Sequence, residues 1–483
     1  MSLIFTANRP KAVSPVIGKP CLSVYLGTVF SLLMRSIVII GNGIAGITAA
    51  REIRKRSDDS LTVISSETDH FFSRTALMYV YMGQLEPHHL KPYEDWFWPK
   101  NRINLLRAHV EKIDFDQKTL FLSERSEGER SREMPYDVLI LALGSTPNSL
   151  GLPGEQLAGV QGLYGLPDLA RMQADTVGVR EAVVVGGGLI GIELCEMLLS
   201  KGIRPTFLVR EKSYWNSVLP DEESALVTNH IREHHVDLRL STELTELVDD
   251  GSGRVGEVVT SAGETLPAQF VGVSVGVRSN IDFLRHTALE TDRGILVNPY
   301  LETNLPGVYA IGDCVQHRTP PPGRKPLEQI WYTGRIMGET LAQTLTGNQT
   351  AYQPGVFFNS AKFFDIEYQT YGMAPARPAE FPDLQSFYWQ HETRKLALRI
   401  YFRADTGAVV GMNTLGIRQR QAVWTEWIAT EKPIGVVMGH LADANFDPEF
   451  FRRYEPDMVA QFARQFPQWP VETRAKKRSF FSW

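Results

Sequence analysis

The stretch that decides the fold is SIVIIGNGIAG, residues 36–46, in which a run of β-branched residues ends directly in glycines. Such a run is typical of a buried parallel strand. The residues from Ile44 to Arg56 then predict a helix, and those from Leu61 to Ser65 predict a second strand. Strand, glycine turn, helix and strand in this order form one βαβ unit.

The spacing of the glycines indicates what this unit binds. Gly41 permits a tight turn, Gly43 lets the backbone approach a pyrophosphate, and Gly46 lets the helix pack closely on the strand. The helix N-terminus then faces the phosphate charge. Glu67 follows the second strand at the distance expected for a carboxylate that bonds a ribose hydroxyl. The unit therefore predicts a dinucleotide site.

The same pattern occurs a second time in EAVVVGGGLIG, residues 181–191. A helix is expected from about Leu189 to Lys201 and a strand from Thr206 to Arg210. The chain thus carries an internal duplication of the βαβ unit. The glycines of this second turn are Gly186, Gly188 and Gly191.

Two neighbouring residues at the end of the second unit bear on the choice of nucleotide. Glu211 favours NAD through a hydrogen bond to the 2′-hydroxyl, whereas Arg210 accommodates the 2′-phosphate of NADP. Arg210 directly ends the predicted strand and Lys212 is nearby, which slightly favours NADPH. NADH remains the alternative.

Three further segments complete a larger pattern: LALGS at 141–145, VGVRSN at 275–280 and TNLPGVYAIGD at 303–313. With the two glycine turns, they resemble the pyridine nucleotide–disulfide oxidoreductase superfamily over nearly all of residues 35–430. Ser279 stands where that family has proline. The resemblance implies FAD on the first unit, NADH or NADPH on the second, and Asp313 bonded to the ribityl chain.

The resemblance also implies a set of binding residues. Glu193 would lie close to the nicotinamide, although an ordinary glutamate at a helix N-terminus is the alternative. The N-terminus of the helix that contains Trp331 would lie near the flavin pyrimidine edge. The expected FAD contacts are Gly41, Gly43, Ile44, Ala45, Gly46, Glu67, Arg74, Val110, Ala142, Gly144, Asp313, Gln329 and Trp331. The expected NAD(P) contacts are Gly186, Gly188, Leu189, Ile190, Gly191, Glu193, Arg210, Glu211 and Gly276.

The redox cysteines of the disulfide reductases are missing. Their Cys-x4-Cys region reads HFFSRTAL here, at residues 70–77, and contains no cysteine. Cys21, Cys195 and Cys314 are far apart and suit neither a disulfide framework nor a metal site. Since a thiol relay needs a thiolate beside the flavin, electrons should leave the flavin directly. Catalysis is then centred on the flavin, and no catalytic side chain is assigned beyond the candidate Glu193.

Residues 72–74, with Leu77 and the stretch from Tyr81 to Leu85, instead resemble the rubredoxin and ferredoxin reductase branch, which includes the flavin portion of nitrite reductase. That likeness implies that Arg74 contacts FAD, with a surface salt bridge as the alternative. The segment FFNSAKFFD, residues 357–365, matches the branch only in its aromatic start, its serine and Asp365. The aromatic cluster at residues 93–98 either lines the acceptor side of the flavin or forms core.

The expected fold class is α/β: two Rossmann-like dinucleotide-binding domains followed by a C-terminal α+β interface domain. The FAD domain is expected at 34–155 and 284–354, the NAD(P) domain at 156–283, and the interface domain with its tail at 355–483. A helix is expected at Leu327–Leu345 and a strand at Phe363–Tyr371. Residues 1–33 are expected to be a disordered extension or a misassigned start, and 474–483 a frayed tail.

Composition narrows the class of partner. The 483 residues carry a formal net charge of -5, which argues against nucleic acid or an anionic membrane as the main partner. The apolar run before residue 35 is too short to span a bilayer, and the few cysteines suit the cytoplasm. The pairs at 88–89 and 234–235 are adjacent histidines, expected at the surface, so no metal site is predicted. A homodimer stays open.

Three functions remain open from the sequence. The first is an NAD(P)H-dependent reductase of a small carrier protein of ferredoxin or rubredoxin type. The second is an NAD(P)H oxidase or quinone reductase that acts on a small acceptor. The third is a flavin-binding switch or assembly protein, whose reduction changes only its conformation. A basic exposed groove would favour the first function, and a deep aromatic pocket the second.

Overall fold

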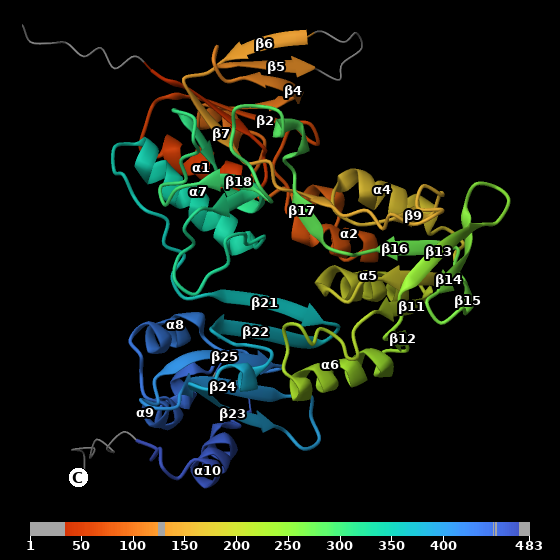
Figure 1. Cartoon of the computed structure of the whole chain (residues 1–483), viewed down its shortest axis with the longest axis vertical. Helices are drawn as coiled ribbons and strands as arrows, with labels where there is room; N and C mark the ends of the chain where they lie inside the picture. The colour runs from red at the N-terminus through yellow and green to blue at the C-terminus, as the bar shows by residue number, and fades with distance from the viewer. Residues whose placement is uncertain (1–33, 124–130, 448, 450–451, 473–483) are drawn as a thin grey trace, which may run out of the picture. The chain divides into compact units, whose positions relative to one another are not determined.

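The computed structural model describes residues 34–123, 131–447, 449 and 452–472. The segments 1–33 and 474–483, whose character was predicted above, lie outside the described residues. Figure 1 labels the helices and strands by the names used below.

The first glycine turn belongs to a five-stranded parallel sheet with the order β19-β7-β1-β2-β3. The central strands β1 and β7 are almost completely buried, whereas the edge strand β3 is partly exposed. Helix α1 follows β1 directly and packs against α7. The bounds are β1 (Ser36–Ile40), β2 (Ser60–Ser65), β3 (Ile103–Arg107), β7 (Val138–Leu141), β19 (Val308–Ala310), α1 (Ile44–Arg54) and α7 (Trp331–Leu345).

The second glycine turn belongs to a sheet of the same construction, with the order β12-β11-β10-β16-β9 and all neighbours parallel. Helix α5 follows its central strand β10, as α1 follows β1. The bounds are β9 (Val160–Gln161), β10 (Glu181–Val185), β11 (Arg204–Val209), β12 (Asp237–Leu240), β16 (Phe270–Val273), α4 (Leu166–Asp175), α5 (Leu189–Ser200) and α6 (Asp221–Glu233).

In both sheets, the direction in which successive strands are added reverses beside the strand that precedes the glycine turn. From β1 the chain first builds outward through β2 and β3 and then returns to pair β7 on the other side of β1. From β10 it builds through β11 and β12 and returns to β16. Ligands of open α/β sheets bind at such switch points, beyond the carboxyl ends of the strands. Gly41 and Gly186 lie at these two points.

Smaller elements connect the two sheets and cover their edges. Strands β8 and β17 form an antiparallel pair where the chain passes between the two sheets and back. The bounds are β4 (His109–Asp114), β5 (Thr119–Ser123), β6 (Ser131–Pro135), β8 (Ser145–Pro147), β13 (Leu244–Asp249), β14 (Val255–Thr260), β15 (Thr265–Pro267), β17 (Val277–Ser279), β18 (Ile295–Val297), β20 (Val315–His317), α2 (Leu77–Met82) and α3 (Phe97–Lys100). Short 3-10 turns occur at Arg74–Ala76, Pro87–Leu90, Asp282–Leu284, Gly312–Cys314, Pro378–Glu380 and Leu441–Ala444.

The C-terminal part is an antiparallel five-stranded sheet, β21-β22-β25-β24-β23, with helices after it. Aromatic residues fill its core, including the fully buried Trp389 and Trp424. The bounds are β21 (Phe358–Phe363), β22 (Ile366–Gly372), β23 (Leu384–Gln390), β24 (Ala397–Arg403), β25 (Val409–Leu415), α8 (Gln421–Ala429), α9 (Ile434–Gly439) and α10 (Glu455–Gln465). The α+β character predicted for this part is confirmed.

Two local predictions were wrong. The residues Phe363–Tyr371 do not form one strand, because the chain reverses between β21 and β22 at Phe364 and Asp365. Phe364 has φ of 54°, a conformation that a bulky residue rarely adopts, so the sequence carries no turn signal there. Helix α7 begins at Trp331 rather than Leu327, since Ile330 is extended.

The strands of the three five-stranded sheets fall within the three predicted domain ranges; the boundaries themselves stay a prediction. Within the part of the chain that the structure describes, every helix is too short or too polar to cross a bilayer.

Candidate functional site

A cavity of about 770 Å³ lies where the first glycine turn, the segment after β19 and helix α5 meet. Its walls include Gly43 from the first turn, Asp313 from the segment after β19, and Glu193 from α5. Residues of both dinucleotide units therefore face one space. Its volume is within the range of ligand and cofactor pockets.

The first glycine turn leaves room for backbone only. Gly41 has φ of 113°, and a Cβ built there would lie 2.0 Å from the carbonyl oxygen of Ala142. A Cβ on Gly46 would lie 2.1 Å from the carbonyl oxygen of Gly41. Gly43, in contrast, has nothing within 4 Å of that position. The turn is therefore tight on the protein side and open on the cavity side, as a pyrophosphate cradle requires.

The second glycine turn repeats this geometry. Gly186 has φ of 111°, and its Cβ position lies 2.3 Å from the carbonyl oxygen of Ser274. The Cβ position of Gly191 lies 2.3 Å from the carbonyl oxygen of Gly186, while that of Gly188 is open. The residues of both turns therefore fit a dinucleotide.

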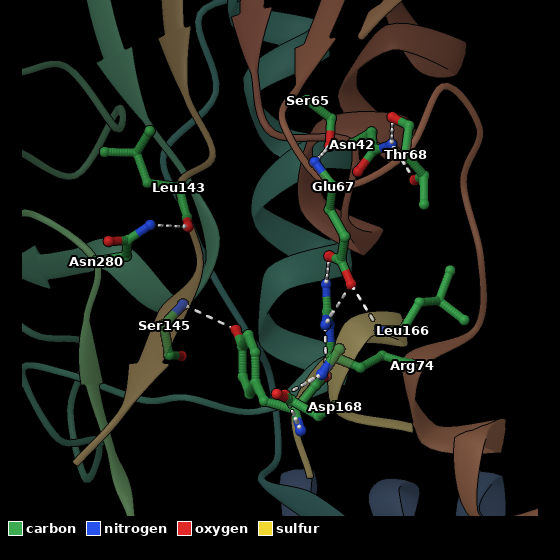
Figure 2. A network of polar contacts seen from close by, with 12 residues as sticks. Asn42, Ser65, Glu67, Thr68, Arg74, Leu143, Ser145, Leu166, Asp168 and Asn280 are labelled. Atoms are coloured by element: carbon green, nitrogen blue, oxygen red, sulfur yellow. Dashed lines mark hydrogen bonds and ion pairs between the residues drawn. The ribbon is translucent and has the colours of Figure 1, made fainter. Parts of the chain in front are cut away.

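Glu67 and Arg74 form an ion pair in the cavity wall, with 2.7 Å between Nη2 and Oε2 (Figure 2). The other carboxylate oxygen of Glu67 accepts a hydrogen bond of 3.0 Å from the backbone N–H of Leu166, at the start of α4. The guanidinium of Arg74 also lies 4.5 Å from the ring centroid of Tyr164. The salt bridge predicted as the alternative role of Arg74 is therefore present, in the cavity wall, and FAD contact by Arg74 stays a prediction.

Asp313 is held by the antiparallel strand pair β8 and β17. Its Oδ2 accepts a hydrogen bond of 2.7 Å from Ser145 Oγ, and the hydroxyl of Ser279 donates to its backbone carbonyl at 3.0 Å. Burial raises the pKa of the Asp313 carboxyl, and the Ser145 hydroxyl and Arg74 partly oppose this. The backbone N–H of Ser145 donates to the hydroxyl of Tyr164 at 3.1 Å (Figure 2).

Glu193 is a half-buried carboxyl on α5 that lines the cavity. Burial raises its pKa to about 7, and the nearby charge of Glu196 adds to this effect. Trp331, the first residue of α7, lines the same cavity and is 41% exposed. An acid that changes charge near neutral pH and an exposed indole are therefore both present at this site.

Arg210 and Glu211 lie at the carboxyl end of β11 and bond to each other, with 2.9 Å between Nε and Oε1. The arginine side chain is 74% exposed and that of the glutamate 30%. The second carboxylate oxygen of Glu211 lies 3.3 Å from the Cβ position of Gly187, within the second glycine turn. The Glu211 carboxylate thus lies beside the turn, and its negative charge offsets the positive charge of Arg210.

The cavity brings together most of the predicted FAD set and little of the NAD(P) set. Its lining contains Gly41, Gly43, Ile44, Ala45, Glu67, Arg74, Val110, Ala142, Gly144, Asp313, Gln329 and Trp331, together with Ile190 and Glu193. Gly46 lies behind the first turn. The other predicted nicotinamide contacts, outside the lining, are Gly186, Gly188, Leu189, Gly191, Arg210, Glu211 and Gly276.

The sequence did not single out Tyr164 or Phe283, which also line the cavity. Neither residue belongs to a spaced motif, so only the folded chain could indicate them. The aromatic residues at 93–98 are absent from the cavity lining. Tyr93, Phe97 and Trp98 contact one another with ring centroids 4.8 to 5.4 Å apart and pack on the first core, which favours the core alternative.

Neither described cysteine is suited to redox chemistry. Cys195 and Cys314 are completely buried, and burial raises the pKa of both thiols, that of Cys314 to about 12. A thiol in that state is a poor nucleophile.

Comparison with known proteins identifies the family. The model of the pyridine nucleotide-disulphide oxidoreductases matches residues 35–337, more than half of the chain. The chain belongs to this family. The predicted α/β fold and the predicted oxidoreductase class, with FAD and NADH or NADPH as cofactors, are thereby confirmed.

Individual relatives place the chain among reductases. It is 30% identical to nitrite reductase [NAD(P)H] of Bacillus subtilis over 59% of this chain and 35% of that one, so it spans about a third of that protein. It is 30% identical to rhodocoxin reductase of Rhodococcus erythropolis, over 68% of this chain and 76% of the relative. The structure of an NAD-dependent persulfide reductase from A. fulgidus matches with a TM-score of 0.77 at 23% identity. The match covers 89% of this chain and 83% of the persulfide reductase.

Proposed function

We propose that this chain transfers a hydride from NAD(P)H to FAD and passes the electrons to a small carrier protein. The observation that carries the proposal is the cavity that the first glycine turn and helix α5 of the second dinucleotide unit both line. The FAD isoalloxazine, when bound, supplies the atom that accepts the hydride and stores the electrons. The chain itself supplies position and electrostatics.

The residues divide this work by place. The open backbone at Gly43 suits the pyrophosphate of FAD, and Asp313 is positioned by Ser145 to accept hydrogen bonds from a hydroxyl of the ribityl chain. Glu193 faces the same cavity from the helix that follows the second cradle. Because its pKa is raised to about 7, its carboxyl can gain or lose a proton near neutral pH.

Two observations support a carrier protein as the acceptor. The buried thiols leave no relay between flavin and substrate among the described residues, so the electrons must leave from the cavity itself. Two relatives are named rhodocoxin reductase and rubredoxin-NAD(+) reductase, and this chain aligns with most of the length of each. A carrier can approach where Ile190, Phe283 and Trp331 are exposed beside the cavity.

The apolar character of those three residues supports a second candidate. A basic groove would have favoured a carrier alone, whereas exposed Trp331 and Phe283 also suit a quinone or another flat small acceptor.

We also propose NADH as the preferred donor, which reverses the small sequence preference for NADPH. Glu211 reaches the second glycine turn, where it can bond a ribose 2′-hydroxyl, and it neutralises Arg210. We also propose that the remaining predicted site residues bind FAD or NAD(P) and that the three domains have the predicted ranges. We further propose that the protein is cytoplasmic and that it can form a homodimer.

Anaerobic stopped-flow measurements test the proposal. NADH should bleach the flavin of the purified protein, and a rubredoxin or a [2Fe–2S] ferredoxin should reoxidise it faster than a quinone or dioxygen does. Faster reoxidation by the quinone would establish the second candidate. A reduced flavin that persists with every acceptor would indicate a switch, and a protein that binds no flavin would refute all three.

A further inference from the structure

Two histidines and an aspartate converge away from the cavity. His230 and His234 are one helical turn apart at the end of α6, and Asp365 lies in the turn between β21 and β22 (Figure 1). The donor atoms of all three lie within 4.8 Å of one another. None of the three lines the cavity. We propose that they bind a divalent transition-metal ion, with Zn²⁺ the best match.

The spacing of the donor atoms fits a small ion. Nε2 of His230 lies 2.7 Å from Asp365 Oδ1, and Nε2 of His234 lies 3.1 Å from it. Donor atoms on a tetrahedral Zn²⁺ are roughly 3.3 Å apart for bonds of about 2.0–2.1 Å. The two distances to Asp365 are within about 0.6 Å of that spacing, and no two of the three donor atoms are more than 4.8 Å apart.

The histidines are prepared for this role by their surroundings. His230 is completely buried, and its Nε2 points at the carboxylate of Asp365. His234 stacks on Phe364 with ring centroids 4.2 Å apart.

The turn that carries Asp365 is built at a conformational cost. Phe364 adopts φ of 54°, which is unfavourable for a bulky side chain, and this conformation brings Asp365 over the two histidines. The Asp365 side chain is 76% exposed, so a fourth position remains open to water. Three protein ligands and one water are a common Zn²⁺ arrangement.

One neighbour has to give way. The ammonium of Lys395 lies 2.8 Å from Nδ1 of His230, which must carry the proton when Nε2 binds a metal. Lys395 has a second partner in Glu233, with which it forms an ion pair, so it can release the imidazole. The metal would then join helix α6 to the first hairpin of the C-terminal sheet.

Zinc titration of the full-length flavin-bound protein, stripped with chelator and dialysed, tests the site by calorimetry. We expect one Zn²⁺ per chain. His234→Gln and Asp365→Asn should each weaken binding by more than the roughly 10–100-fold that loss of an outer hydrogen-bond partner costs. Zn²⁺ should also raise the melting temperature of the native chain and not of these variants.

His235→Asn is the matched control, since His235 is next to the site but outside it and has φ of 63°, which asparagine tolerates. This variant should bind Zn²⁺ as the native chain does, and Lys395→Met should bind it more tightly. Flavin absorbance and circular dichroism confirm that each variant is folded. If the double variant with His234→Gln and Asp365→Asn binds zinc with the same affinity as the native chain, the proposal is overturned.

Discussion

At the scale of single residues, burial determines the chemistry of this site. Glu193 is half-buried on α5, and its pKa is raised to about 7 from an ordinary value of 4.5. Asp313 is also half-buried, and Ser145 donates a hydrogen bond to its carboxylate. Two carboxyl groups of one cavity thus have different surroundings, which suits one for titration and the other for a fixed hydrogen bond.

We expect Glu193→Gln to stabilise the flavin-bound protein at pH 8 and not at pH 5. The folded pKa is higher than the unfolded one, so the native carboxyl loses stability as pH rises from about 4.5 to 7, whereas glutamine does not titrate. The difference at pH 8 should be on the order of 3 kcal/mol. Thermal melts at the two pH values measure it, and an equal effect at both would contradict the raised pKa.

A second residue-scale prediction concerns the nicotinamide nucleotide. Glu211→Ala removes the carboxylate near Gly187 and frees Arg210 for a 2′-phosphate. The ratio of kcat/KM for NADPH over NADH should rise by at least about tenfold, equivalent to roughly 1.4 kcal/mol. Arg210→Ala is the control and should leave NADH use nearly unchanged. An unaltered ratio in Glu211→Ala would show that this carboxylate does not contact the ribose.

At the scale of elements, glycines set how closely α1 and α7 approach. Gly334 and Gly338 are one turn apart on α7. A Cβ on Gly338 would lie 2.7 Å from the carbonyl oxygen of Ala45 and 3.0 Å from the amide nitrogen of Ala49. Because these neighbours are backbone atoms of α1, only a displacement of the helix would make room. That helix begins at the first glycine turn, so its position also sets the cradle.

Gly338→Val should therefore destabilise the protein by about 1–3 kcal/mol, the usual cost of overpacking, and weaken FAD retention. Urea unfolding and flavin content after gel filtration measure the two effects. Glu339→Ala, next to it on the exposed face and paired only with Arg335 among the described contacts, is the control and should change stability by less than about 0.5 kcal/mol. Full flavin retention in Gly338→Val would show that the packing of α1 on α7 does not determine FAD binding at the first glycine turn.

At the scale of the whole molecule, a buried ionic network joins α6 to the C-terminal sheet. Arg399 on β24 bonds Glu223 on α6 at 2.9 Å, with side chains 5% and 1% exposed. Asn413 on β25 donates to the other oxygen of Glu223 at 2.9 Å. Burial raises the pKa of Glu223, and Arg399 opposes this. The network is fully bonded on the buried side, so removing one partner leaves an unpaired charge.

Arg399→Met should consequently cost about 3–5 kcal/mol, the usual effect of breaking a buried ion pair. Arg399→Met combined with Glu223→Gln should cost less than the sum of the single changes, because neither charge is then left alone. Urea unfolding of the four proteins of this cycle provides the measurement. Additive costs would mean that the two side chains do not interact in solution.

The sequence by itself determined the two dinucleotide units, because glycine spacing and β-branched runs are local: a turn without Cβ atoms can be read from Gly41, Gly43 and Gly46 alone. It also determined that no cysteine pair stands beside the flavin position. Only the tertiary structure decided the pairing of Glu67 with Arg74, the cavity positions of Tyr164 and Phe283, and the reversal at Phe364.

The cluster of His230, His234 and Asp365 shows the reason most clearly. The two histidines are four residues apart in the sequence, a spacing that puts them on one face of a helix, but two histidines alone do not define a metal site. The third member is 131 residues beyond His234 in the chain. Contacts across such distances depend on how separate cores pack together, and this information is in no local pattern.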